Sequence, residues 1–354
     1  MKTKIVVDSS ANLYALSGVD FVCVPLKIVT DDGEYLDTAE LDAVGMAQTL
    51  RSYKGKTGTS CPNVADWLAA YEGAEEVFVV TITGTLSGSY NAAQLAAEEY
   101  QQEHEGARVF VLDSLSAGPE CRLLAERLAA LVQAGCAFDD VAEKILAYHR
   151  HTHLLFSLES LANLARNGRV KPAVAAVARM LGIRVIGQAS EAGEREVLCK
   201  TRGEHGALER IVLEMKGRGF VSGRVHIAHC GNPDAADRLK KMLHAVFPGA
   251  QVDVSPCGGL CSYYAELGGL MYSADKTGIA SENTFVTSEG QQTFGEEQQT
   301  VSQYCYYTHK DKVIIIATCW CGSILIYLII LEIIQKIFRK PSADNEEKEK
   351  NHDL

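Results

Sequence analysis

The first 277 residues alternate short apolar runs, rich in β-branched residues, with longer segments of helical periodicity. Leu124, Leu128 and Leu131, for example, recur at the spacing of one helix face. Strands are expected at residues 4–8, 21–29, 77–81, 108–113, 154–158, 184–187, 195–201, 225–229 and 251–254. Helices are expected at residues 64–71, 91–104, 120–134, 139–151, 172–181 and 235–246. This alternation predicts an α/β protein with parallel sheets covered by helices.

The apolar segments form two groups separated near residues 149–156, which predicts two globular domains, residues 1–152 and 153–277. We expect each domain to contain a mainly parallel sheet flanked by helices. The pattern changes after residue 277, because residues 278–311 are polar and rich in Gln, Glu, Thr and Ser. This composition is typical of a linker.

Residues 313–331 contain no charged residue, and eleven of them are Val, Ile or Leu. These eleven favour insertion into a bilayer by roughly 3–7 kcal/mol in total. A buried core helix would also be apolar, but the polar neighbours favour a single transmembrane helix over residues 312–338, followed by a charged tail at 339–354. No signal-like segment precedes the first strand, so we expect a cytoplasmic globular part anchored to the membrane by residues 313–338.

The charge and the cysteines narrow the range of functions. A net charge of −11 repels phosphate backbones, so no nucleic acid is expected as a partner. The eleven cysteines are scattered without the paired spacing of a zinc finger, and we expect them to be reduced. His149 and His153 have i,i+4 spacing, but no carboxylate partner stands out nearby, so no metal site is expected.

Four loops beside the expected strands and helices are rich in Ser, Thr and Gly, at residues 8–12, 57–62, 83–89 and 113–118. Glycine lets a backbone approach a ligand closely, and hydroxyls and free helix N–H groups donate to an anion. Any one of these loops could be an ordinary helix cap. Several at equivalent strand ends indicate a binding site. The phosphate-binding loop with its Lys is absent from the sequence, which favours a carboxylate over a triphosphate.

A serine hydrolase is the main alternative. A nucleophile elbow requires Gly-x-Ser-x-Gly after a strand. Ser114 replaces the first Gly of that motif around Ser116, and the spacing around Ser87 is wrong. No histidine can be assigned to either serine from the sequence. Hydrolysis of an acyl ester by Ser87 or Ser116 therefore remains an alternative hypothesis.

Residues 1–275 also contain a series of short motifs. They are Asp8-Ser9-Ser10-Ala11-Asn12-Leu13, Thr59-Ser60-Cys61-Pro62, Leu86-Ser87-Gly88-Ser89-Tyr90, the turn at 113–118, Leu158-Glu159-Ser160-Leu161 with Gly168-Arg169, Lys200-Thr201-Arg202, residues 229–233 and Gly268-Gly269-Leu270. Each motif is weak alone, but the ordered set resembles the DegV family of bacterial fatty-acid-binding proteins. The resemblance does not include the C-terminal tail.

The resemblance implies a two-domain DegV-like fold and a non-catalytic carrier without a cofactor. Such a protein binds a long-chain fatty acid and presents its carboxylate to a fatty-acid kinase, and the acyl phosphate feeds phospholipid synthesis. The resemblance assigns the carboxylate to Thr59, Ser60, Ser87 and Gly88. It places the acyl chain in an apolar pocket between helices of the N-terminal domain.

Three further residues receive weaker assignments from the resemblance. Arg169 and Arg202 match positions near the head group or on a kinase-facing surface. Tyr264 stands in the region where many family members carry a histidine, and contact between Tyr264 and the head group is a hypothesis. Because family members normally end near the position of Asp275, a membrane-tethered adaptor without a ligand is a further alternative.

Overall fold

The computed structural model describes residues 2–170, 182–275, 304–309 and 312–317. The chain divides into two compact units, Met1–Thr284 and Phe285–Leu354, and each is described by itself. The first unit contains a parallel, an antiparallel and a mixed sheet. The helix expected at residues 172–181 lies outside the described residues.

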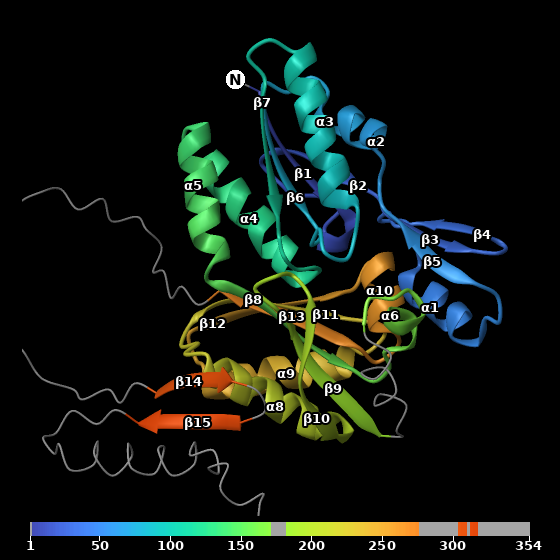
Figure 1. The fold of residues 1–354 in the computed structure, drawn as a ribbon, viewed down its shortest axis with the longest axis vertical. Helices are drawn as coiled ribbons and strands as arrows, with labels where there is room; N and C mark the ends of the chain where they lie inside the picture. Colours follow the sequence, from blue (N-terminus) through green and yellow to red (C-terminus); the bar gives the residue numbers. More distant parts are fainter. Residues whose placement is uncertain (1, 171–181, 276–303, 310–311, 318–354) are drawn as a thin grey trace, which may run out of the picture. The chain divides into compact units, whose positions relative to one another are not determined.

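The N-terminal sheet is parallel throughout, in the order β2-β1-β6-β7, which confirms the parallel arrangement expected there. Its strands are β1 (Thr3–Asp8), β2 (Asp20–Val24), β6 (Glu76–Thr81) and β7 (Arg108–Asp113). One face carries α2 (Val64–Tyr71) and α3 (Ser89–Glu103), and the other carries α4 (Pro119–Gln133) and α5 (Phe138–His149) (Figure 1). Side chains of a strand alternate between faces, so Ile5 and Val7 pack with α4 while Val6 packs with α2 and α3.

A small antiparallel sheet, in the order β4-β3-β5, follows β2. It consists of β3 (Lys27–Thr30), β4 (Gly33–Leu36) and β5 (Thr57–Ser60), with α1 (Ala43–Ser52) between β4 and β5. A 3-10 turn, η1 (Ser9–Ala11), follows β1. The single strand expected at 21–29 is therefore two strands in two sheets. Pro25 separates them because it has no amide hydrogen to donate to a ladder.

The C-terminal sheet has the order β10-β9-β8-β13-β11-β12. Its strands are β8 (Thr152–Leu158), β9 (Ile183–Ala189), β10 (Arg195–Arg202), β11 (Gly223–His229), β12 (Ala250–Pro256) and β13 (Leu270–Asp275). Only the β11–β12 pair is parallel, so the prediction of a mainly parallel sheet in this half is wrong. The loop between β9 and β10 is too short for the crossover that parallel strands need, and β13 is inserted antiparallel between β8 and β11.

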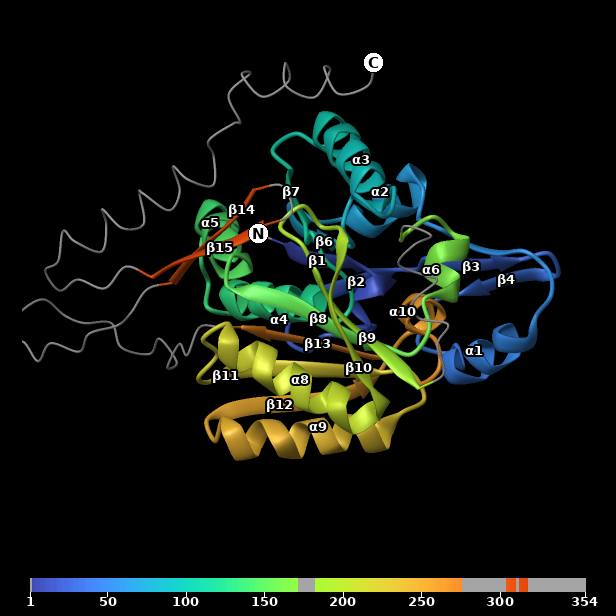
Figure 2. The ribbon, with the colours of Figure 1, turned by 60° about the horizontal axis from the view of Figure 1, so that its bottom comes forward.

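In the described part of this half, four helices accompany the sheet: α6 (Ala162–Arg166), α8 (Gly203–Gly217), α9 (Pro233–Val246) and α10 (Gly259–Ala265). Buried residues of α8 and α9, among them Leu208 and Leu239, pack on one face. The other face meets α4, which contacts β1 and β6 of the N-terminal sheet as well as β8, β11 and β13. Helix α10 lies beside α1 and β3, as Figures 1 and 2 both show. The two halves of the first unit therefore share α4 and α10 as packing elements.

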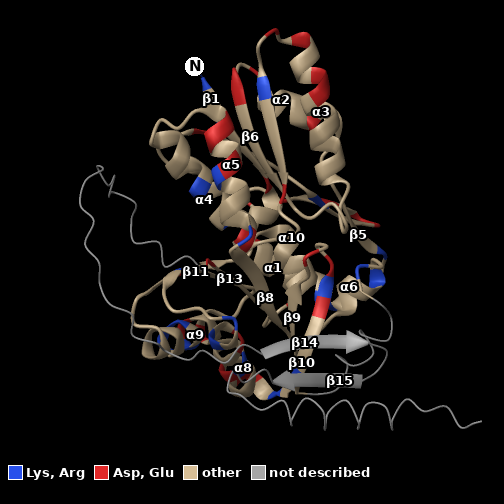
Figure 3. Cartoon of the chain, turned by 60° about the vertical axis from the view of Figure 1, so that its left-hand side comes forward, with Lys and Arg blue, Asp and Glu red and all other residues tan. Residues whose placement is uncertain are grey.

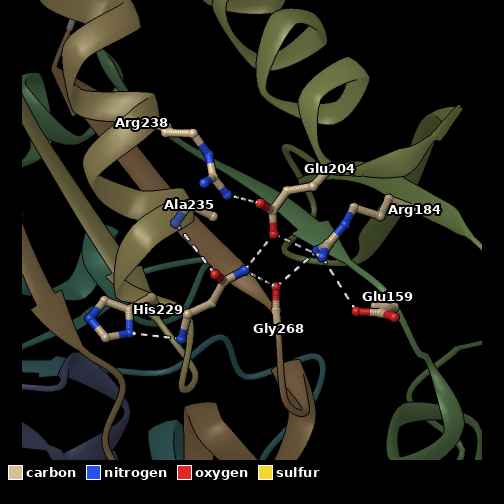
Figure 4. A network of polar contacts seen from close by, with 8 residues as sticks. Glu159, Arg184, Glu204, His229, Ala235, Arg238 and Gly268 are labelled. Atoms are coloured by element: carbon tan, nitrogen blue, oxygen red, sulfur yellow. Dashed lines mark hydrogen bonds and ion pairs between the residues drawn. The ribbon is translucent and has the colours of Figure 1, made fainter.

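A polar network near one end of the C-terminal sheet centres on Glu204, in the first turn of α8 (Figure 4). Its carboxylate accepts hydrogen bonds from Arg184 at 3.1 Å and from Asn232 at 2.8 Å, and it also pairs with Arg238. Burial alone would raise the pKa of Glu204, but the hydrogen bond from Asn232 and the two arginine charges outweigh it and lower the pKa. The ionised form of Glu204 therefore stabilises the fold.

Replacing Glu204 by Gln is expected to lower the free energy of unfolding by about 1–2 kcal/mol at pH 7. A carboxyl group whose pKa is lower in the folded state stabilises above its unfolded value, here 4.5, and loses this effect as the pH falls through the folded pKa. Urea unfolding of both proteins should show the difference at pH 7 and a smaller one at pH 4. Glu159→Gln is the matched control, because exposed Glu159 also pairs with Arg184. An equal loss at both pH values would contradict the prediction.

In the second unit, β14 (Tyr304–His309) pairs antiparallel with β15 (Lys312–Ala317). The helix expected at 312–338 is therefore wrong over its first six residues, which are a strand. Four consecutive β-branched residues, Val313 to Ile316, favour this conformation. The rest of that segment, including the charged tail at 339–354, lies outside the described residues. Within the residues that the structure describes, no helix has the length and apolar character of a membrane span.

Candidate functional site

A cavity of about 240 Å³ in the first unit is lined by segments that are far apart in the sequence. All four residues predicted to hold a carboxylate line it: Thr59, Ser60, Ser87 and Gly88. Arg169 and Tyr264 line it as well. Arg202, at the far end of β10, is exposed and is not among the lining residues. The cavity thus brings together the two hydroxyl-rich elements that the sequence singled out.

Helix α10 fixes one wall of this cavity through its two tyrosines. The hydroxyl of Tyr264 lies 2.8 Å from Thr59 Oγ1, and the hydroxyl of Tyr263 lies 2.7 Å from Thr57 Oγ1. The two threonines belong to β5, so these bonds join β5 to α10. Burial raises the pKa of Tyr264, which therefore keeps its proton at neutral pH and can donate a hydrogen bond.

The start of α3 forms another wall. Gly88 occupies the cap position before the helix and has no side chain to cap it, while the neighbouring Ser87 hydroxyl accepts a hydrogen bond from the Ser89 amide at 3.3 Å. Uncapped N–H groups at a helix start favour an anion. Acidic residues of α3 lie in its C-terminal half, away from this turn (Figure 3). A Cβ atom added at Gly88 would lie 3.1 Å from Cys61 Sγ, so glycine allows the close approach of the two loops.

The predicted Asp-Ser-Ser turn has a positioning role. Asp8 is fully buried, and its carboxylate accepts hydrogen bonds from the Ser10 amide at 3.2 Å, the Ile82 amide at 2.9 Å and the Ser89 hydroxyl at 2.6 Å. Burial raises the pKa of Asp8, and these hydrogen bonds oppose that effect. Asp8 thus ties the end of β6 to the start of α3. It holds Ser87 and Gly88 in place without lining the cavity.

Asp37 has a similar role for α10 and was not identified from the sequence. Its buried carboxylate accepts hydrogen bonds from the Gly259 amide at 2.6 Å, the Leu260 amide at 2.9 Å and the Tyr14 hydroxyl at 2.7 Å. Asp37 therefore caps a helix that begins 222 residues later in the chain. No local motif around Asp37 marks this contact, which is why sequence patterns miss it.

An apolar extension continues from the cavity. It shares Ile82, Leu164, Arg195, Leu260 and Tyr264 with the cavity and otherwise consists mostly of apolar residues of the C-terminal half, such as Phe156, Leu158 and Met271. Its volume is about 20 Å³, close to that of one water-sized sphere. An alkyl chain entering it must displace side chains. Flexible methionines such as Met271 adapt readily to such a change.

Two arginines line the cavity and differ in their partners. Arg169 donates from Nη1 to the Asn167 carbonyl at 2.6 Å and from Nε to the Leu86 carbonyl at 3.4 Å. Arg195 lies at the start of β10 and was not predicted. The sequence alone indicated hydroxyls without a fixed cation, and the structure adds these guanidinium groups to the site.

The geometry gives no support to a serine nucleophile. No histidine is among the described residues that line the cavity around Ser87. Ser116 is buried outside that lining, and His149 Nε2 lies 2.8 Å from the Ser114 carbonyl. His226 pairs with Ser255 at 2.9 Å, and burial lowers its pKa to about 3. Neither His149 nor His226 is therefore paired with Ser87 or Ser116 in the described part of the chain.

A second cavity, of about 410 Å³, contains none of the predicted site residues. Its lining includes the buried Glu120 together with His149, Thr152 and Arg218. The Glu120 carboxylate accepts a hydrogen bond from Thr152 Oγ1 at 2.7 Å. Its larger volume does not make it the better candidate, because the residues predicted for a carboxylate converge on the other cavity.

Comparisons with known proteins agree with this fold. The sequence model of the DegV family, described as an uncharacterised protein family, matches residues 2–275. A DegV domain-containing protein of Streptococcus pneumoniae is 40% identical over 275 residues, which is 77% of this chain and 98% of that protein.

Two solved structures are similar over the same region. A DegV family protein from Eubacterium eligens, loaded with heptadecanoic acid, has a TM-score of 0.76 and 40% identity, covering 77% of this chain and 99% of that one. The fatty acid kinase (Fak) B3 protein of Streptococcus pneumoniae, loaded with linoleic acid, has a TM-score of 0.76 and 39% identity, covering 78% of this chain and 99% of that one. On the family match and these identities, the chain belongs to the DegV family.

Proposed function

We propose that this protein binds a long-chain fatty acid in the 240 Å³ cavity, with the carboxylate at Thr59, Ser60, Ser87 and Gly88. The observation that carries the proposal is the convergence of both hydroxyl-rich elements on one cavity with an apolar extension. Similar proteins that hold heptadecanoic and linoleic acid support it. We place the acyl chain in the apolar extension rather than between helices of the N-terminal half.

The acyl chain and the carboxylate are expected to contribute differently to the free energy of binding. A 16-carbon chain buries about 14 methylenes at about 0.8 kcal/mol each, or roughly 11 kcal/mol before costs. Hydrogen bonds to a carboxylate contribute about 1.5–3 kcal/mol each, from which desolvation is subtracted. Displacing the side chains that now fill the extension reduces the gain from burial. The chain should therefore set affinity, while the hydroxyls should orient the carboxylate.

We further propose that the protein is a non-catalytic subunit that presents the carboxylate to a fatty-acid kinase. A similar protein carries the name of a fatty acid kinase component, which supports this role. Exposed Arg202 is a candidate for the kinase-facing surface, and Arg169 and Tyr264 are candidates for the head-group contact. A cytoplasmic location of the globular part stays a prediction, whereas the tether expected at residues 313–338 is wrong over residues 313–317, which belong to β15, and lies outside the described residues beyond them.

Replacing Ser87 by Ala is expected to reduce kinase-dependent acyl-phosphate formation at least 10-fold and fatty-acid retention less than 3-fold. The reason is that the hydroxyl orients the carboxylate while the chain supplies most of the affinity. Phosphorylation assays with a partner kinase and ligand quantification by mass spectrometry measure the two effects. Ser17→Ala, in an exposed loop outside the cavity lining, is the control. Equal losses of both activities would contradict this division.

Native mass spectrometry of the full chain purified from cells tests the binding proposal. A stoichiometric long-chain fatty acid, released on denaturation, is the expected result. A protein that is empty and takes up no added fatty acid would overturn the proposal and favour an adaptor role. A burst of product from an activated ester would instead favour the hydrolase alternative.

A further inference from the structure

Arg195 holds an unusual position at the first residue of β10. It lines both the hydroxyl-lined cavity and its apolar extension. Among the residues that the structure describes, its guanidinium group has neither a hydrogen-bond nor an ion-pair partner. Arg169, the other arginine of the lining, donates to two backbone carbonyls. Only one of the two cations is therefore already engaged by the described protein groups.

The loop before Arg195 is held against the N-terminal half. Gly193 has φ +77°, and a Cβ atom there would lie 2.1 Å from Thr83 Oγ1 and 3.2 Å from Leu115 Cα. Thr85 Oγ1 also lies 3.4 Å from the Ala192 carbonyl. On the other side, Arg195 is in register with Ala189 of β9. These contacts fix the backbone of Arg195 beside the cavity.

The electrostatics of this position favour an anionic partner. Burial lowers the pKa of Arg195, and the nearby charge of Arg169 acts in the same direction. An arginine nevertheless stays protonated at neutral pH. A desolvated cation without a partner is costly, and a carboxylate that pairs with it removes much of that cost. Neutral hydroxyls cannot do the same, because they bind charged and uncharged oxygen groups alike.

We propose that Arg195 pairs with the carboxylate of the bound acid and makes the cavity selective for ionised fatty acids over their neutral esters. This inference rests on the proposed function and adds the chemical form of the ligand. Thr59 and Ser87 then orient the head group, and Arg195 recognises its charge. Fatty-acid esters fill the same apolar space but leave the guanidinium group unpaired.

Competitive binding of palmitic acid and methyl palmitate to the full chain tests this selectivity. The wild type should prefer the acid at least 10-fold. Arg195→Leu should lose at least 10-fold in affinity for the acid and bind the ester as tightly as before. Arg195→Lys should keep part of the preference, because it retains the charge without the guanidinium geometry. Arg210→Leu, at an exposed position of α8 outside the lining of the cavity and of its extension, is the control and should behave like the wild type.

The variants distinguish a failure of the proposed role of Arg195 from a failure of fatty-acid binding itself. Ester binding that is retained in Arg195→Leu shows an intact cavity, and Arg195→Gln supplies a polar neutral variant should the leucine variant unfold. An unchanged preference for the acid in either neutral variant would overturn the role of Arg195 while leaving fatty-acid binding intact. A wild type that binds neither palmitic acid nor its ester would overturn the proposed function and this inference together.

Discussion

Replacing Asp37 by Ala is expected to lower the free energy of unfolding by about 3–5 kcal/mol and to abolish ligand retention. The change leaves the amides of Gly259 and Leu260 and the hydroxyl of Tyr14 without their common acceptor in a buried site. Helix α10 then loses the acceptor that holds its first turn, and contacts such as those with α1, β3 and β5 are left to keep it in place. Because α10 carries Leu260 and Tyr264 into the cavity, the wall of the site should be lost with it. Urea unfolding and ligand quantification measure the two effects.

Asp42→Ala is the matched control for Asp37→Ala. Asp42 also caps a helix, since its side chain accepts from the Gly45 amide at 2.9 Å, but it is exposed and has this one donor. Loss of such a cap costs about 1 kcal/mol. Similar stability losses in the two variants would show that the buried contacts of Asp37 contribute no more than an ordinary cap.

Replacing Asp8 by Asn is expected to lower the free energy of unfolding by about 2–4 kcal/mol. Each carboxylate oxygen of Asp8 accepts one backbone amide, one from Ser10 and one from Ile82. An amide side chain places its NH₂ group at one of these positions, so two donors face each other in a fully buried site. Because Asn has the same shape as Asp, the decrease in the free energy of unfolding reflects hydrogen bonding and charge alone. Urea unfolding at pH 7 measures it.

Ser89→Ala is the control for the Asp8 substitution. It removes a single hydroxyl donor to Asp8 and leaves both backbone amides paired, so about 1–2 kcal/mol should be lost. If Asp8→Asn lowered the free energy of unfolding no more than Ser89→Ala, the hydrogen bonds from the backbone amides to the carboxylate would contribute little to stability. The Asp-Ser-Ser turn would then lose its assigned role in holding the β6–α3 loop.

The N-terminal half was predictable because its signals are local. The strand at Arg108–Asp113 and the helix at Val64–Tyr71 have the bounds expected from the apolar pattern. A parallel sheet follows from strands that alternate with helices. In the C-terminal half, the same kind of apolar run forms antiparallel pairs. The direction of β13 depends on which strands it is inserted between, and no periodicity within Leu270–Asp275 encodes that choice.

The sequence predicted those site residues that belong to short motifs, and it missed those that do not. Thr59 and Ser87 stand in hydroxyl-rich loops, and this local composition marks them in the amino-acid sequence itself. Asp37 and Arg195 stand alone in the sequence, and their roles arise from contacts with distant segments. The seven-residue helix α10 is too short to show a convincing helical period. Contacts between residues that are far apart in the sequence become visible only in the folded structure.

The dispersed origin of the cavity lining has a thermodynamic consequence. Residues as distant as Leu26, Ser87, Leu164 and Leu260 meet there, so neither half of the first unit can supply the complete binding surface alone. Any molecule that occupies it binds the native state and not the denatured chain. Mass action then adds about 2.7 kcal/mol to the unfolding free energy at a free concentration 100 times the dissociation constant. The melting temperature of the protein should consequently rise with the fraction of molecules that hold a ligand.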